Sequence, residues 1–251
     1  MLHNRTLAVV LVLALLLALN GGTAVRTTFD FPRLTLWAWE RPEQLRFLTS
    51  SDVAVAFLAG SVYLDAEPTT RLRAQPLRVN PETPLIAVVR LEVTPKTLAA
   101  FPDEYRAAVV RQILHAVDLP RVRAVQIDFD ATRSQRPFYT ALLQDLRSQS
   151  PPGRVLSITA LASWCFGDDW IAGLPIDEAV PMLFRLGMDR ANIVSALDDG
   201  RDFREPLCRS SIGISTDEPW PEPLLHRRVY VFDPRPWDAA TFNAVERKLA
   251  Q

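Results

Sequence analysis

Eight short runs of apolar, strand-forming residues recur along this chain, separated by stretches long enough for a helix or a loop. This spacing constrains the fold more than any other feature, because strands that alternate with helices build parallel β/α units. The runs are Leu34–Trp39, Val53–Ala59, Leu85–Val93, Val122–Phe129, Val155–Ala162, Ala179–Arg185, Ser211–Thr216 and Arg228–Asp233. Eight such runs in about 225 residues predict a single compact TIM-like (β/α)8 barrel over residues 30–251.

The segments between these runs contain several helical patterns. Apolar residues at helical spacing predict helices over residues 41–48, 102–117, 136–149 and 236–250. Residues 60–84 lack that spacing and predict an irregular or β excursion, so some helices of the barrel are short or replaced by loops. The alternative fold is a doubly wound open sheet, but no Gly-rich phosphate turn follows the first run, which weakens this alternative.

Composition limits the possible functions. The chain has 251 residues, of which 48% are hydrophobic and 23% charged, enough to bury one sizeable core. A net charge of −1 without blocks of like charge argues against a nucleic-acid surface. The sequence has no phosphate loop, no Ser-centred nucleophile elbow and no His/Cys cluster, so we expect neither a cofactor nor a metal.

The N-terminus differs in character from the rest of the chain. An apolar run, Leu7–Leu19, follows His3 and Arg5 and precedes the small residues Gly22 and Ala24. This run has the length of a signal-peptide core and is short for a membrane span, which needs about 20 apolar residues. We expect residues 1–24 to be an export signal or an uncleaved membrane anchor. In either case the folded part lies in the periplasm or outside the cell.

Export affects how the two cysteines are interpreted. Cys165 and Cys208 are too few and too far apart in sequence for a zinc site. An oxidising compartment permits a disulfide between them, and two independent buried thiols are the alternative.

The stretch "AVQIDFDATRSQRPFY" places two acids at the end of a buried strand. Because side chains alternate along a strand, Gln126, Asp128 and Asp130 share one face, and apolar residues share the other. In a barrel the apolar face packs under the helices. We therefore expect the two aspartates to point inward, about 6.5 Å apart by strand rise.

Polar and aromatic residues also end other predicted strands or begin the loops after them. They are Trp37, Trp39, Glu40, Arg90, Thr159, Trp164, Asp217, Glu218 and Asp233. The carboxyl ends of the strands form the site-bearing face of a (β/α)8 barrel, so this convergence predicts a site there.

Acids flanked by tryptophans favour glycoside chemistry, in which one carboxyl protonates the leaving oxygen and another acts as nucleophile or base. We expect Asp130 and either Glu218 or Asp217 to form this pair, with Asp128 tuning Asp130 and Arg90 orienting it. The aromatic rings would hold sugars. Each of these residues also has a structural interpretation. The aspartates would cap loops or form ion pairs with arginines, the Asp217–Glu218 pair would shape a turn, and the tryptophans would pack in the core.

A family resemblance adds to this reading. "AVQIDFDATRSQRPFYTALLQDLR" followed by "LSITALASW" resembles a bacterial family of exported proteins named as a domain of unknown function, family 3142. More distantly, "IDFD" is similar to the fourth-strand signature of chitinase-like barrels, in which two alternate aspartates precede a catalytic glutamate. Asp128 and Asp130 match those aspartates, whereas Thr132 holds the place of the glutamate, which removes the proton donor from its family position.

Two functions follow. In the first, the protein is an exported glycoside-hydrolase-like enzyme that acts on a glycan or cell-envelope polysaccharide by carboxylate chemistry. In the second, it is a catalytically inactive barrel that binds carbohydrate with the same face. The missing glutamate favours the second function, and the paired acids favour the first.

Overall fold

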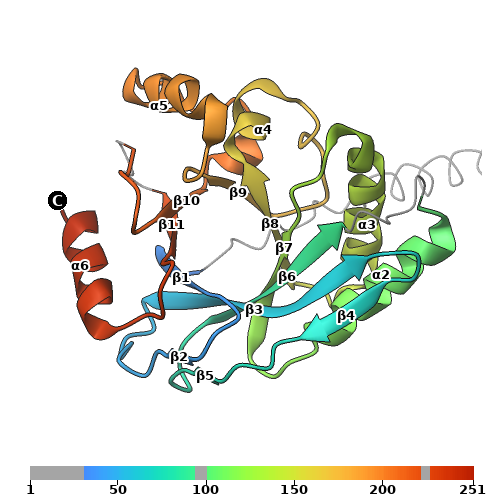
Figure 1. Ribbon diagram of the computed structural model, residues 1–251, viewed down its shortest axis with the longest axis horizontal. Coiled ribbons are helices and arrows are strands. Elements are labelled where there is room, and N and C mark those ends of the chain that lie inside the picture. Colours follow the sequence, from blue (N-terminus) through green and yellow to red (C-terminus); the bar gives the residue numbers. More distant parts are fainter. Residues whose placement is uncertain (1–30, 94–100, 222–226) are drawn as a thin grey trace, which may run out of the picture. The chain divides into compact units, whose positions relative to one another are not determined.

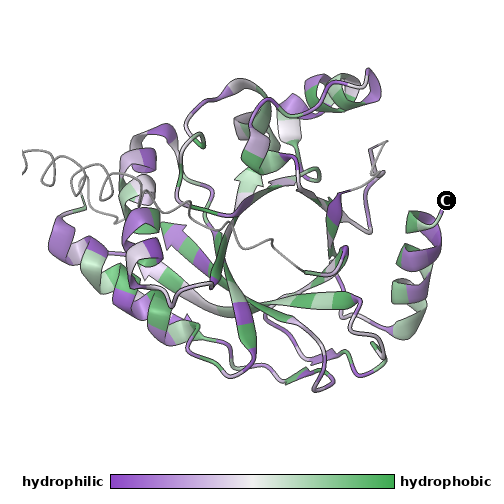
Figure 2. Ribbon diagram, turned by 180° about the vertical axis from the view of Figure 1, so that it is seen from behind, coloured by the Kyte–Doolittle hydropathy of each residue, from purple (hydrophilic) through white to green (hydrophobic). Residues whose placement is uncertain are grey.

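The computed structural model describes residues 31–93, 101–221 and 227–251, in which eight parallel strands close into a barrel (Figure 1). The strands are β1 (Leu34–Ala38), β3 (Val53–Leu64), β6 (Leu85–Val93), β7 (Val122–Asp128), β8 (Val155–Leu161), β9 (Glu178–Met182), β10 (Ser211–Ser215) and β11 (Arg228–Phe232). β1 closes the barrel because it pairs in parallel with both β3 and β11. Figure 2 shows the strands as a closed ring from behind. The predicted (β/α)8 fold is confirmed. The predicted export signal lies outside the described residues.

Helices cover the barrel unevenly. They are α2 (Asp103–Ala116), α3 (Arg136–Gln149), α4 (Ala162–Gly167), α5 (Arg190–Asp198) and α6 (Ala239–Leu249), with short 3-10 turns η1 (Arg133–Gln135), η2 (Gly187–Asp189) and η3 (Pro206–Cys208). α2, α3 and α6 confirm three predicted helices. Figure 1 shows α2 and α3 beside β6 and β7, where they bury apolar side chains such as Ile113 and Leu142. In the described residues, no helix has the length and apolar character that crossing a membrane requires.

The helix predicted over residues 41–48 is wrong. Its start forms a short strand, β2 (Glu43–Gln44), which pairs in parallel with β5 (Leu77–Arg78). The Glu43 carboxylate is fully buried, where it accepts the backbone N–H of Trp237 at 2.9 Å and pairs with Arg41 at 2.7 Å. A single short helix is marginal by itself, so these long-range contacts override the local pattern.

The predicted β excursion after the second barrel strand is present. β3 continues past the barrel, and its last residues pair antiparallel with β4 (Thr69–Leu72). The register of β3 against β6 shifts between Leu58 and Gly60, and the pairing then continues to Leu64. A hairpin and the β2–β5 pair therefore stand where regular barrels have helices.

The apolar face of each strand packs outward, as the alternation predicts. Val125, Ile127 and Phe129 join the core beneath the helices, whereas Gln126 lies buried on the opposite, inner face. Buried polar groups must find partners, and here they find them across the barrel. The resulting hydrogen-bonded chain runs through Trp37, Gln126, Ser157, Glu178, Tyr230 and Arg228.

This inner network holds a buried charge. The Glu178 carboxylate is 1% exposed, accepts the Tyr230 hydroxyl at 2.8 Å and pairs with the Arg228 guanidinium at 2.6 Å. At its other end, the Trp37 indole N–H donates to the Gln126 carbonyl at 2.9 Å. The network thus fixes the orientation of Trp37 from beneath.

Cys165 and Cys208 form a disulfide, with their Cα atoms 5.9 Å apart. Cys165 lies in α4, and Cys208 ends η3. Both residues are fully buried. The bond joins α4, which follows β8, to η3, which precedes β10.

Candidate active site

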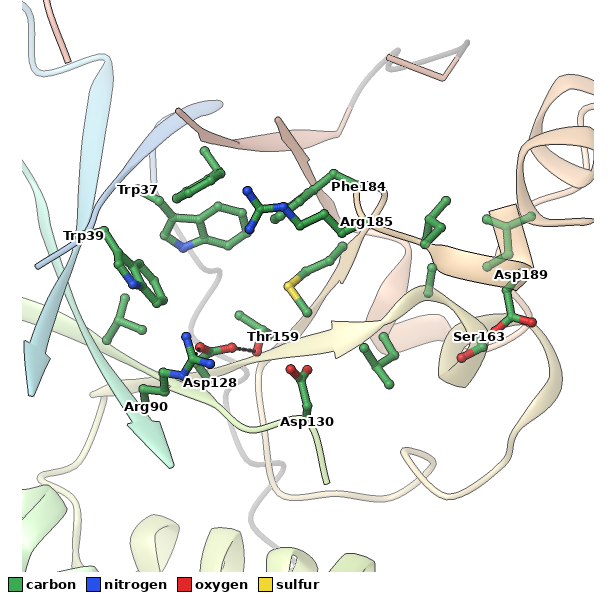
Figure 3. Close-up of a pocket in the computed structure, with 17 residues that line it drawn as sticks. Trp37, Trp39, Arg90, Asp128, Asp130, Thr159, Ser163, Phe184, Arg185 and Asp189 are labelled. Atoms are coloured by element: carbon green, nitrogen blue, oxygen red, sulfur yellow. Dashed lines mark hydrogen bonds and ion pairs between the residues drawn. The ribbon is translucent and has the colours of Figure 1, made fainter. Parts of the chain in front are cut away.

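A cavity of about 350 Å³ opens at the carboxyl ends of the barrel strands (Figure 3). Six residues that the sequence singled out lie together in its wall: Trp37, Trp39, Arg90, Asp128, Asp130 and Thr159. They come from β1, β6, β7 and β8 or from the positions just after them. The barrel therefore brings together side chains that are more than 100 positions apart, as the strand-end argument predicts.

Asp128 is the more buried of the two acids. Its side chain is 13% exposed, accepts the Thr159 hydroxyl at 2.7 Å and lies 4.0 Å from the Arg90 guanidinium. Burial raises the pKa of the Asp128 carboxyl, because removal from water penalises the charged form. The Thr159 hydrogen bond and the Arg90 charge lower that pKa, whereas the negative charge of Asp130 raises it further.

Asp130 lies two positions further, at the open end of the cavity, where solvent reaches it. The protein around Asp130 still raises the pKa of its carboxyl by desolvation, and Arg90 opposes this shift. Both carboxyls therefore hold a proton to a higher pH than ordinary aspartates do. Carboxyls in a cleft whose pKa is shifted in this way are typical of functional sites.

Aromatic rings form much of the remaining wall. Trp37 is 3% exposed, and its ring centroid lies 5.3 Å from that of Tyr230 below it. The rings of Phe184 and Phe232 are stacked, with centroids 5.8 Å apart and planes 8° from parallel. Trp39 lies beneath the Arg90 guanidinium, 5.8 Å from its ring centroid. The cavity thus combines two acids with flat apolar surfaces.

Sequence reasoning missed part of the wall, namely Phe184, Arg185, Asp189 and Phe232. The sixth predicted strand ends with Phe184 and Arg185, but β9 ends at Met182, and the two residues follow it. Phe232 is the last residue of β11. The same strand-end rule that found Asp128 could have found these three, whereas Asp189 belongs to η2 and carries no such signal.

Glu218 and Asp217, expected to face Asp130, are not among the residues that line the cavity. The Glu218 carboxylate accepts the backbone N–H of Arg185 at 2.9 Å and pairs with the Arg190 guanidinium at 2.8 Å. Asp217 accepts a hydrogen bond from the Ser215 hydroxyl. Glu218 therefore supports the loop after β9.

Three further predicted site residues also lie outside the cavity wall. Glu40 accepts two backbone N–H groups, those of Ala74 and Gln75, each at 3.1 Å. Trp164 is buried, with its ring centroid 4.9 Å from that of Trp170. Asp233 is 1% exposed, and it accepts the Thr216 hydroxyl and the Arg235 backbone N–H. These residues hold loops or fill the core.

Thr132 occupies the place of the chitinase-like glutamate, and it caps a turn. Its backbone N–H donates to Gln135 at 2.8 Å, in a capping box that begins η1. It does not line the cavity. Over the described ranges, no three His, Cys, Asp or Glu side chains gather into a group that could hold a metal ion.

Residues 80–181 match the family described as Domain of unknown function (DUF3142). A comparison with curated proteins gave no match. The fold is similar to the crystal structure of a candidate chitinase A from Streptomyces coelicolor, which is 10% identical, with 86% of this chain and 97% of that chain covered and a TM-score of 0.54.

Two other solved structures are similar at lower scores. A fungal endo-β-N-acetylglucosaminidase from glycosyl hydrolase family 18 is 12% identical, with 81% of this chain and 90% of that chain covered and a TM-score of 0.48. The Bacillus cereus spore cortex-lytic enzyme SleL is 13% identical, with 73% of this chain and 50% of that chain covered and a TM-score of 0.46. The fold of this chain is therefore similar to that of the chitinase-like barrel from Streptomyces coelicolor, and its residues 80–181 match the domain of unknown function that the strand motifs resemble.

Proposed function

We propose that this protein is a glycoside hydrolase that acts on a glycan in the cavity at the carboxyl ends of its strands. One observation carries the proposal: two aspartates whose pKa is raised by burial line an aromatic cavity at the catalytic face of the barrel. Asp128 and Asp130 supply the acid, and the rings of Trp37, Trp39 and Phe184 supply surfaces on which sugars pack.

Asp130 is the proton donor in this proposal, because solvent and substrate reach it more easily than Asp128. Its raised pKa keeps the carboxyl protonated until it gives the proton to the leaving glycosidic oxygen. The negative charge that then forms on Asp130 raises the pKa of Asp128, so the pair avoids carrying two charges. A water molecule that attacks the sugar returns a proton to Asp130.

Asp128 keeps its place through Thr159, whose hydroxyl donates to it at 2.7 Å. Arg90 approaches from the other side at 4.0 Å and limits how far the pKa of either carboxyl rises. Arg90 from β6 thus lowers the pKa of both carboxyls, and Thr159 from β8 lowers that of Asp128. This arrangement replaces the expected partnership with Glu218.

The proposed location follows from the N-terminal sequence. The apolar run in residues 1–24 directs the protein out of the cytoplasm, where cell-envelope polysaccharides are the available glycans. The disulfide between Cys165 and Cys208 fits an oxidising compartment.

The test is a screen of the protein against chromogenic glycosides and a glycan array. Asp130→Asn keeps the shape of the side chain and removes the acid, so we expect turnover to fall about 100-fold or more. Asp118→Asn, an exposed position on the loop before β7, is the matched control and should keep full activity. Activity of the unchanged protein should decline as the pH rises through the raised pKa of Asp130.

Two outcomes contradict the hydrolase proposal. The first is glycan binding without turnover, unchanged in Asp130→Asn, which supports the inactive carbohydrate-binding barrel. The second is turnover that survives Asp130→Asn, which places the acid elsewhere.

A further inference from the structure

The loop after β9 places an arginine at the cavity wall. Arg185 lines the cavity, and its guanidinium packs over the Phe232 ring, 5.3 Å from the centroid. Figure 3 shows the side chain reaching from the β9 side back toward Trp37. Among the residues that the structure describes, none forms an ion pair or a side-chain hydrogen bond with the Arg185 guanidinium.

The backbone at Arg185 is held in an unfavourable conformation. Its φ angle is 53°, in the left-handed region that residues other than glycine seldom adopt. Glu218 holds this turn, because one carboxylate oxygen accepts the Arg185 N–H at 2.9 Å and the other pairs with Arg190 at 2.8 Å. Backbone strain that neighbouring groups maintain is concentrated at functional sites.

The second arginine of the cavity differs from Arg185 in its surroundings. The Arg90 guanidinium has acids close to it, Asp128 at 4.0 Å and Glu92 at 3.8 Å. Its charge is therefore partly balanced within the protein. Arg185 instead keeps its five N–H donors in a planar fork that matches the two oxygens of a carboxylate.

We propose that the glycan bound in this cavity carries a carboxylate group, which Arg185 binds. The inference rests on the proposed function and names its substrate class: acidic sugars, either uronic acids or amino sugars bearing a lactyl ether. One guanidinium balances one negative charge. Asp189 lines the same cavity, so a group with two negative charges would be repelled more strongly than a carboxylate.

The test measures the affinity of the protein for pairs of oligosaccharides that differ only in the acid group. One pair is an oligosaccharide containing glucuronic acid and its methyl ester. The other is a fragment of alternating N-acetylglucosamine and N-acetylmuramic acid and its methyl ester. We expect the free acid of one pair to bind about tenfold or more tightly than its ester. The reason is that a hydrogen bond between charged groups contributes more free energy than one to a neutral ester.

Arg185→Gln should remove most of this preference, and the preference should also weaken as salt is added. Arg111→Gln, on the exposed face of α2, changes the net charge equally and should keep the preference. Equal affinity for acids and esters in both pairs, or an equal loss in the two variants, overturns the proposal.

The same measurements separate this inference from the proposed function. Preferential binding of acids without hydrolysis supports the role of Arg185 and contradicts the hydrolase proposal. Hydrolysis of neutral oligosaccharides with no preference for acids supports the hydrolase proposal and contradicts the role of Arg185.

Discussion

Replacing Gly213 with alanine is expected to destabilise the barrel by forcing Trp37 to move. A Cβ atom at Gly213 would lie 2.7 Å from Cη2 and 3.0 Å from Cζ3 of the Trp37 indole. The indole has little freedom to yield, since it is 3% exposed, donates to Gln126 at 2.9 Å and packs on Tyr230. Overpacking of this kind costs about 1–3 kcal/mol, of which the lower chain entropy of alanine offsets about 0.5–1 kcal/mol.

Because the 2.7 Å contact places the cost in the upper part of its range, the net expectation is a loss of about 1–2.5 kcal/mol in the free energy of unfolding. In a domain of this size, each kcal/mol lowers Tm by about 2–4 °C. Urea denaturation of Gly213→Ala measures it, and Gly167→Ala is the control, because a Cβ at Gly167 meets no atom within 4 Å. Trp37→Phe removes both contacting atoms, so the double variant should recover about 1 kcal/mol relative to the sum of the single changes. Additive effects, or an unchanged Gly213→Ala midpoint, would refute the reasoning.

Two further predictions concern stability. Burial raises the pKa of Asp128, so the native state binds this proton more tightly than the unfolded state, and wild-type stability falls as the pH rises above the ordinary value of about 3.9. Asp128→Asn should therefore be more stable than wild type at neutral pH, with a difference in urea midpoint that vanishes below about pH 4. Loss of the disulfide, whose cysteines are 43 positions apart, should cost about 4 kcal/mol. Comparing the urea midpoints of Cys165→Ala/Cys208→Ala and wild type, with and without reductant, measures this cost. A reductant effect on the variant would contradict the assignment of the cost to this disulfide.

The fold could be predicted from the sequence because its determinants are local and repeated. Alternation along residues 122–129 assigns each side chain to a face without knowledge of its neighbours, and Gln126 and Asp128 lie where that alternation puts them. The three helices with clear apolar periodicity are present for the same reason. Strand ends then identified Trp37, Arg90 and Thr159 as neighbours of the acids.

Other features depend on contacts that no local pattern records. Residues 41–48 carry a helical pattern, yet Glu43 is buried under Trp237, which lies 194 positions away. Glu218 lies two positions beyond a predicted strand, and a neighbouring arginine and a backbone N–H occupy its carboxylate. Strand position places both acids near the carboxyl ends of strands, whereas it does not reveal the partners that Glu218 finds.

Because the barrel is closed, the segment that matches the family is not a structural unit by itself. Residues 80–181 contain β6, β7, β8 and most of β9, an arc whose first strand pairs with β3 and whose last pairs with β10. Cut out as a fragment, this arc would expose two rows of unpaired backbone groups, which promote aggregation between chains. It would also lack Trp37, Arg185 and Phe232 from the cavity wall. The matched segment is thus a portion of a folding unit, and its boundaries are unsuitable for expression of an independent domain.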